Sequence, residues 1–156
     1  MESNNLRDRQ AKLSIALYAH VNEICALTDA YLGKFEREDF FVLSGSEEQN
    51  KLYRKEYYAF VSKLPNMISN AQDNVASLSS LLTEADEQGD IDTIDLIGSK
   101  IEAYLRIEAA LAEYSSESKA AIGEARISPT RLVNAARRLK SATEAEISNI
   151  LDKENG

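Results

Sequence analysis

The stretch LSIALYAHVNEICALTDAY, residues 13–31, decides the fold of this chain. Its less polar residues recur every three or four positions, so they share one face of an α-helix. The same stripe continues outward in both directions and comprises Leu6, Leu13, Leu17, Val21, Ile24, Thr28, Tyr31 and Phe35. The pattern predicts a helix from about Asn4 to Arg37.

A second apolar run keeps a helical phase from Leu52 to Ala85 and passes through Pro65. Proline lacks a backbone N–H and its ring crowds the preceding turn, so it bends or ends a helix. We expect one long helix from about Glu47 to Glu87 that is kinked at Pro65, with two helices meeting there as the alternative. Ser46 and Gln49 have the spacing of a capping box at its start.

Two further helices are expected in the second half of the chain. The third begins near Asp90, whose side chain can accept from the free N–H groups of a first turn, and it ends between Gly123 and Ile127. Serines from Ser115 to Ser118 fall near its apolar stripe and predict a bend or fraying there. The last helix has Ser128 as N-cap and Pro129 at its first position.

These four helices predict an all-α fold, an elongated antiparallel up-down-up-down four-helix bundle that forms one domain over residues 1–156. Short connections force neighbouring helices to run in opposite directions. Both termini and the connection near Gln88 then lie at one end of the bundle. The expected core comprises Leu17, Val21, Ile24, Leu64, Ile68, Val75, Leu78, Ile97, Ile101, Leu105, Leu139 and Ile147.

Composition narrows the range of functions. The formal net charge is −8 and the pI is near 4.8, so the surface repels phosphate backbones and anionic lipids, and no nucleic-acid partner is expected. No segment has the roughly 20 apolar residues of a membrane-spanning helix. We therefore expect membrane attachment only through segments outside this chain. One cysteine and one histidine cannot build the common zinc, haem or Cys–His sites, so neither a cofactor nor enzymatic activity is expected.

Individual polar residues also fail to predict a metal centre. His20 and Glu23 are three apart on the first helix, but a di-iron bundle needs a second Glu-x-x-His element. The acidic run from Glu84 to Asp95 lacks the spacing of a calcium-binding loop. Cys25 has apolar neighbours and no clustered bases, which predicts a buried, unreactive thiol.

Eight of the eleven aromatic residues lie between Tyr31 and Phe60, at the end of the bundle remote from the termini. One interpretation is that they close this end of the bundle. The other is a binding site in which aromatic faces and cationic donors meet a carboxylate-bearing ligand. The candidate ligand-binding residues are Tyr31, Arg37, Tyr53, Arg54, Tyr57, Arg126 and Arg131.

Three stretches resemble a known family. Residues 35–49, FEREDFFVLSGSEEQ, followed by Tyr53 to Tyr58, are similar to the acidic, aromatic turn of helical sensor domains. Residues 101–111, IEAYLRIEAAL, resemble the tyrosine-containing helix that follows in those domains. The family is that of the extracytoplasmic helical-bundle sensor domains of bacterial chemoreceptors and sensor histidine kinases.

The resemblance implies a non-enzymatic, periplasmic ligand-binding domain of an inner-membrane receptor. Such a domain binds a small molecule or a binding protein, passes a helix displacement to the membrane, and pairs as a homodimer. The alternative is a complete cytoplasmic protein that acts as an adaptor, immunity protein or regulator through its acidic surface. Hydrophobic segments of about 20 residues on both sides of the domain in the parent gene would favour the sensor.

Overall fold

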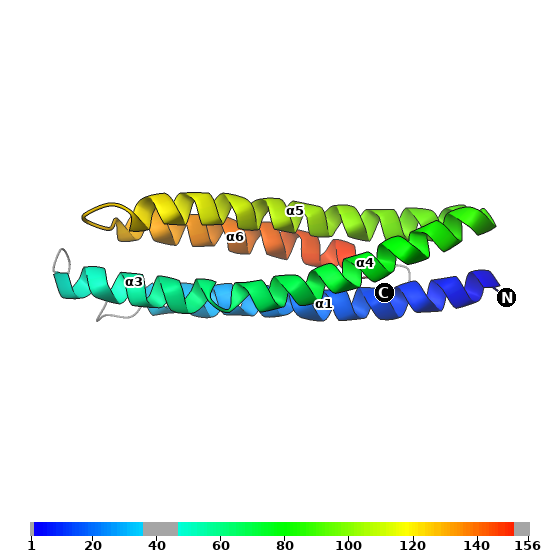
Figure 1. The fold of residues 1–156 in the computed structure, drawn as a ribbon, viewed down its shortest axis with the longest axis horizontal. Coiled ribbons are helices and arrows are strands. Elements are labelled where there is room, and N and C mark those ends of the chain that lie inside the picture. The colour runs from blue at the N-terminus through cyan, green and yellow to red at the C-terminus, as the bar shows by residue number, and fades with distance from the viewer. Residues whose placement is uncertain (1, 36–46, 152–156) are drawn as a thin grey trace.

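A computed structural model describes residues 2–35 and 47–151, and their regular structure is entirely helical. The five helices are α1 (Glu2–Phe35), α3 (Glu47–Val61), α4 (Leu64–Gln88), α5 (Ile91–Ile122) and α6 (Pro129–Ile150). Figure 1 shows an elongated molecule in which α3 and α4 follow one another along a single side. In the same view α1 and α5 run in one direction, whereas α3, α4 and α6 run in the other.

The predicted helix boundaries are largely those of the structure. Asp90 caps α5 by accepting from the Thr93 backbone N–H at 3.3 Å, and the Thr93 hydroxyl donates to the same carboxylate at 2.7 Å. Gly89 ends α4 with a φ of 70°, a left-handed conformation that glycine adopts without a side-chain clash. Ser128 caps α6 with Pro129 in its first turn, as predicted.

Two local expectations differ from the structure. The second predicted helix is two helices, which was the alternative, because a turn at Ser62 and Lys63 interrupts the regular helix and Pro65 lies in the first turn of α4, where no N–H is needed. In α5, no fraying occurs at the serines: Ser118 is buried within a continuous helix, and its hydroxyl donates to the Ser115 carbonyl at 3.4 Å. The proposed Ser46 capping box lies outside the described residues.

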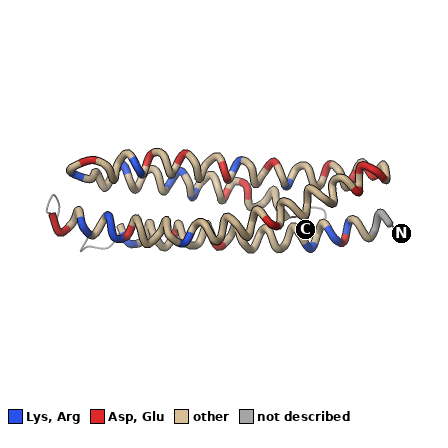
Figure 2. The backbone as a smooth tube through the Cα atoms, viewed as in Figure 1, with Lys and Arg blue, Asp and Glu red and all other residues tan. Residues whose placement is uncertain are grey.

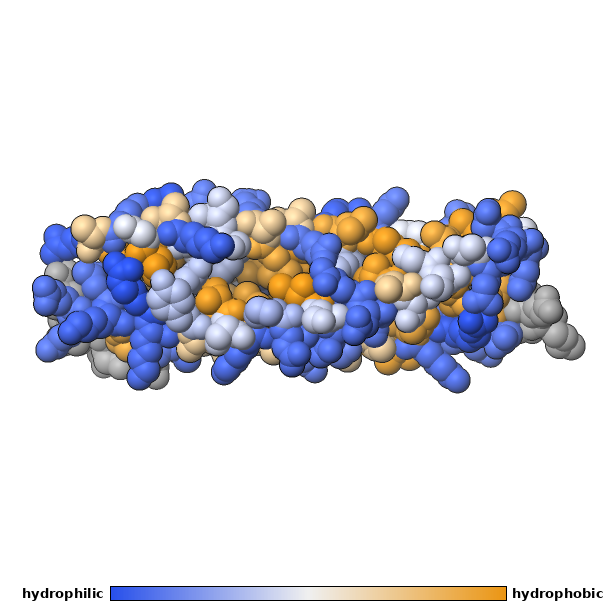
Figure 3. All heavy atoms as spheres, in the orientation of Figure 1, coloured by the Kyte–Doolittle hydropathy of each residue, from blue (hydrophilic) through white to orange (hydrophobic). Residues whose placement is uncertain are grey.

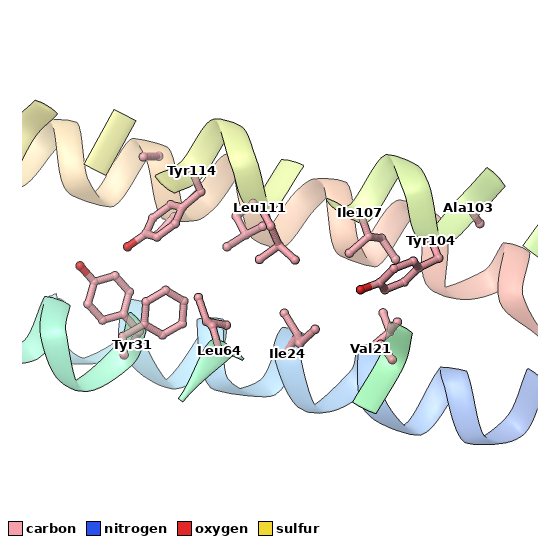
Figure 4. Packing of buried hydrophobic residues seen from close by; sticks show 14 of the residues in the cluster. Val21, Ile24, Tyr31, Leu64, Ala103, Tyr104, Ile107, Leu111 and Tyr114 are labelled. Atoms are coloured by element: carbon pink, nitrogen blue, oxygen red, sulfur yellow. The ribbon is translucent and has the colours of Figure 1, made fainter. Parts of the chain in front are cut away.

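The core follows a strict heptad pattern on α1. Besides Leu6, Cys25 and Leu32, eight buried positions of α1 are spaced alternately by four and three residues, the repeat of helices that pack along a common seam. They are Gln10, Ser14, Leu17, Val21, Ile24, Thr28, Tyr31 and Phe35. Figure 4 shows this face of α1 opposite Ala103, Tyr104, Ile107 and Leu111 of α5.

Most of the predicted core residues are buried, but Leu105 is not. Its side chain is 52% exposed, because neighbouring positions Tyr104 and Ile107 point inward and leave position 105 on the outer face of α5. Ile68, Val75, Ile101 and Ile147 are half-buried against the core. Figure 3 accordingly shows apolar surface along the middle of the viewed face, between α5 above and α3–α4 below.

The bundle is not uniform along its length. Figure 1 shows α6 ending well before the end that α1, α4 and α5 reach together. At that far end Arg9 pairs with Glu84 of α4, its Nη2 lying 2.8 Å from Oε2. Three helices therefore form this end of the described structure.

Candidate functional site

The predicted aromatic end contains a closed cluster of rings. We name as the aromatic cluster Tyr31, Phe35, Tyr53, Tyr57, Phe60 and Tyr114, all of which are buried. Tyr31 stacks on Phe60 with ring centroids 4.4 Å apart, and Phe35 stacks on Tyr53 at 5.7 Å. Their ring faces are thus used for packing between α1, α3 and α5, and a ligand would have to displace them to stack there.

The hydroxyl groups of the aromatic cluster are buried as well. Figure 4 shows the Tyr31 and Tyr114 hydroxyls pointing toward one another across the core, and neither forms a hydrogen bond of good geometry with a described residue. Tyr57 differs, because its hydroxyl oxygen accepts a 3.3 Å hydrogen bond from Ser118. Burial raises the pKa of Tyr31 to about 12, and it also raises the pKa of Tyr114. Both phenols are therefore neutral near pH 7.

The predicted cationic residues bind protein groups at the end of α5. Arg54 donates to the Ile122 carbonyl at 2.6 Å and to the Glu124 carbonyl at 3.2 Å. It therefore binds the last carbonyl of α5, which has no partner within the helix, and one carbonyl of the turn that follows. Arg131 pairs with Glu124 at 2.5 Å and with Glu117 at 3.6 Å.

Two predicted site residues remain. Arg126 is exposed and already engaged in an interaction, and Arg37 lies outside the described residues. Thus Tyr31, Tyr53 and Tyr57 lie in the core, while Arg54 and Arg131 bind α5 and the turn after it.

A different concave site lies between the first and last helices. A groove of about 400 Å³ is lined by Asp29, Leu32, Gly33, Arg137, Lys140, Ser141 and Glu144. We name it the α1/α6 groove. Gly33 leaves one wall open, since a Cβ built there would meet nothing within 4 Å.

Charge in the α1/α6 groove is mixed. Lys140 Nζ lies 2.6 Å from Asp29 Oδ1 and 3.8 Å from Glu144 Oε1, and the hydrogen bond to Asp29 raises the pKa of the lysine. Arg137 lines the same groove and forms no ion pair within the described residues. The groove therefore offers a guanidinium that is open to an anion, together with carboxylates for a cation.

Sequence reasoning did not identify the α1/α6 groove, because its walls are about 110 residues apart in the chain, as the separation of Asp29 and Lys140 shows. The sequence feature that could have indicated the groove is the pair Arg137 and Lys140 on the polar face of the last helix, one turn before Glu144.

Cys25 lies close to the α1/α6 groove. Its side chain is buried, and desolvation raises the pKa of its thiol.

Within the described residues, no three His, Cys, Asp or Glu side chains gather closely enough to hold a metal ion. No helix in the described ranges is both long and apolar enough to cross a bilayer. No protein-family model, curated protein or solved structure matches this chain.

Proposed function

We propose that the chain is a non-enzymatic sensory domain of a bacterial transmembrane receptor, a periplasmic antiparallel up-down-up-down four-helix bundle that binds a small molecule and acts as a homodimer. The observation that carries the proposal is the position of the α1/α6 groove. It joins the first and last helices, which are the two that would connect a domain of this kind to membrane segments.

Binding in the α1/α6 groove can change the position of α1 relative to α6. Asp29 and Gly33 belong to α1, whereas Arg137, Lys140 and Ser141 belong to α6. A ligand that touches both walls stabilises one relative position of the two helices over others, and small helix shifts are an established form of switching. The Lys140–Asp29 pair already bridges the walls, so a ligand that competes for either partner changes this contact.

The groove chemistry favours a small ligand that carries a carboxylate. Arg137 supplies planar paired donors for it, and Ser141 adds a hydroxyl. Asp29 and Glu144 would accept from an ammonium group on the same ligand.

The aromatic end is the second candidate binding site, the one predicted from the sequence. Binding there requires the rings of the aromatic cluster to separate.

A thermal-shift screen of small carboxylates, amino acids and amines tests this proposal. A ligand present at about 100 times its dissociation constant stabilises a one-site protein by about 2.7 kcal/mol. Arg137→Ala should abolish the shift. Arg138→Ala is the matched control, because Arg138 faces Glu113 of α5 at 3.7 Å and does not line the groove.

The outcomes separate the two locations. Hits that survive Arg137→Ala but disappear in Arg54→Ala and Tyr57→Ala would place the site at the aromatic end. A silent screen would favour the alternative function, an acidic cytoplasmic adaptor, immunity protein or regulator that works through protein contacts. That alternative draws support from the three-helix end of the bundle, because α6 ends at Ile150 and does not cover α1 and α5 there.

A further inference from the structure

The seam between α5 and α6 continues on α5 beyond the point where α6 ends. Arg106 Nε lies 3.0 Å from Glu146 Oε2, and Arg138 Nε lies 3.7 Å from Glu113 Oε1, so positions 106 and 113 face α6. Ser99 and Asp92 occupy the same helical position one and two heptads earlier. Each heptad advances by about 10 Å, but α6 extends only four residues past Glu146.

The wall contributed by α1 carries an exposed apolar side chain at this end of the bundle. Asp29 contacts Lys140 of α6, and Ile15 occupies the equivalent position two heptads earlier. Ile15 is 61% exposed, and the Asp29 side chain is similarly exposed at 65% although it contacts α6. This heptad position therefore lies at the outer edge of the α1 wall, where Ile15 presents a large apolar side chain to solvent.

A groove lies at the level where α6 has ended and no described residue continues it. It has a volume of about 310 Å³ and is lined by Arg7 of α1 and by Asp92, Asp95, Leu96 and Ser99 of α5. We name it the α1/α5 groove. Leu96 is half-buried and is heptad-equivalent to Ala103 and Ala110, which lie along the α5 seam. The floor is thus the apolar seam of a bundle, and the shape that completes it is another helix.

Charge around the α1/α5 groove is predominantly acidic. The lining carries two carboxylates and one guanidinium, and the adjoining α4–α5 turn adds Asp86, Glu87 and Asp90. Figure 2 shows acidic residues gathered at this end of α4 and α5. No Lys or Arg occurs between Glu84 and Ser99. A basic helix complements this rim, whereas an acidic helix is repelled.

We propose that the α1/α5 groove docks a basic amphipathic helix of a partner protein, which takes up the α6 position at the three-helix end. Its apolar face packs on Leu96 in the groove and, beyond the groove lining, on Ile15 of the α1 wall, and its Lys or Arg side chains reach Asp92 and Asp95. This site is separate from the α1/α6 groove and does not depend on the proposed sensory function. It also supplies a role for the acidic run that the sequence left unexplained.

The test uses two fluorescent synthetic helices of about 18 residues with the full chain. Both carry leucine at the a and d positions of a heptad repeat; one has lysine at the flanking positions and the other has glutamate. We expect the lysine peptide to bind, and the paired substitution Asp92→Lys and Asp95→Lys to weaken it by about tenfold or more. The glutamate peptide should bind the charge-reversed variant better than the original chain.

Apolar docking is tested by Ile15→Asp, which replaces an exposed side chain and so leaves the fold intact, and by Leu96→Asp. Leu105→Asp is the matched control for Ile15→Asp, since Leu105 is likewise a large apolar side chain that is more than half exposed, but it lies on the outer face of α5 away from the groove. Ile15→Asp should abolish binding while Leu105→Asp retains it. Equal effects of the two variants, or equal binding of both peptides, would overturn the proposal.

Two other occupants give distinct results. If the lysine peptide binds only after deletion of residues 152–156, the groove belongs to the chain's own C-terminal residues and the proposal is wrong. If the peptide never binds but Ile15→Asp dissociates a dimer in sedimentation experiments, the occupant is a second copy, and the proposal is again wrong.

Discussion

Lys100 of α5 donates a 2.7 Å hydrogen bond from Nζ to Oε1 of Gln10 of α1, a residue 90 positions earlier in the chain. Both side chains are buried, and Lys100 also donates to the Ser14 hydroxyl at 2.7 Å. A buried ammonium is stable only when its donors are satisfied. The contact joins α1 to α5 directly at the three-helix end, where α6 does not separate them.

Gln10→Leu should therefore destabilise the fold by about 1–3 kcal/mol, because the buried ammonium loses an acceptor while the apolar volume is nearly unchanged. Urea denaturation followed by circular dichroism measures the change. Lys12→Leu on the exposed face of α1 is the control and should change stability by less than about 0.5 kcal/mol. Equal effects of the two substitutions would show that the Gln10 contact is unimportant.

The hydroxyls of the aromatic cluster should differ in their contributions. Tyr57→Phe removes one of the two acceptors of the Ser118 hydroxyl, the other being the Ser115 carbonyl, and should cost about 0.5–1.5 kcal/mol. Tyr114→Phe removes a buried hydroxyl that faces the Tyr31 hydroxyl without a hydrogen bond of good geometry, so it should be neutral or stabilising. Chemical denaturation of the two variants side by side measures this. A larger loss for Tyr114→Phe than for Tyr57→Phe would contradict it.

Burial of Tyr31 predicts a loss of stability at high pH. Its pKa rises from 10 unfolded to about 12 folded, so the stabilising contribution is complete below pH 10. Between pH 10 and 12 the unfolded state loses the phenolic proton first, and the free energy of unfolding falls. Melting temperatures measured from pH 8 to pH 12 should drop less steeply in Tyr31→Phe. Tyr58→Phe, at a 56% exposed side chain, should follow the unmodified chain.

Local sequence predicted the helices well, because caps and stripes depend on residues a few positions apart. Asp90 and Ser128 are clear examples, since each accepts from the N–H three residues later. The two grooves could not be predicted in this way. The α1/α6 groove depends on Asp29 meeting Lys140, and the α1/α5 groove depends on α6 ending at Ile150 while α5 extends beyond it.

The predicted aromatic site illustrates a related difficulty. The sequence places Tyr31 and Tyr57 at the correct end of the bundle, but period alone does not say whether a ring points into the core or toward a ligand. Stacking of Tyr31 on Phe60 turns this ring inward. Arg54 could not be assigned either, because its carbonyl partners on Ile122 and Glu124 are about 70 residues away.

Stability measurements on variants of α4 and α5 provide the sharpest test of the core. Leu78→Ala on α4 removes a side chain with no exposed surface and should cost about 2–5 kcal/mol, because the cavity cannot collapse fully. Ile101→Ala, at a half-buried position, should cost less than Leu78→Ala. Leu105→Ala should change stability by less than about 0.5 kcal/mol, since that side chain is mostly in solvent. Urea denaturation of the three variants should give the largest cost for Leu78→Ala and the smallest for Leu105→Ala. If Leu105→Ala costs as much as Leu78→Ala, position 105 is covered in solution, by a second copy or another partner.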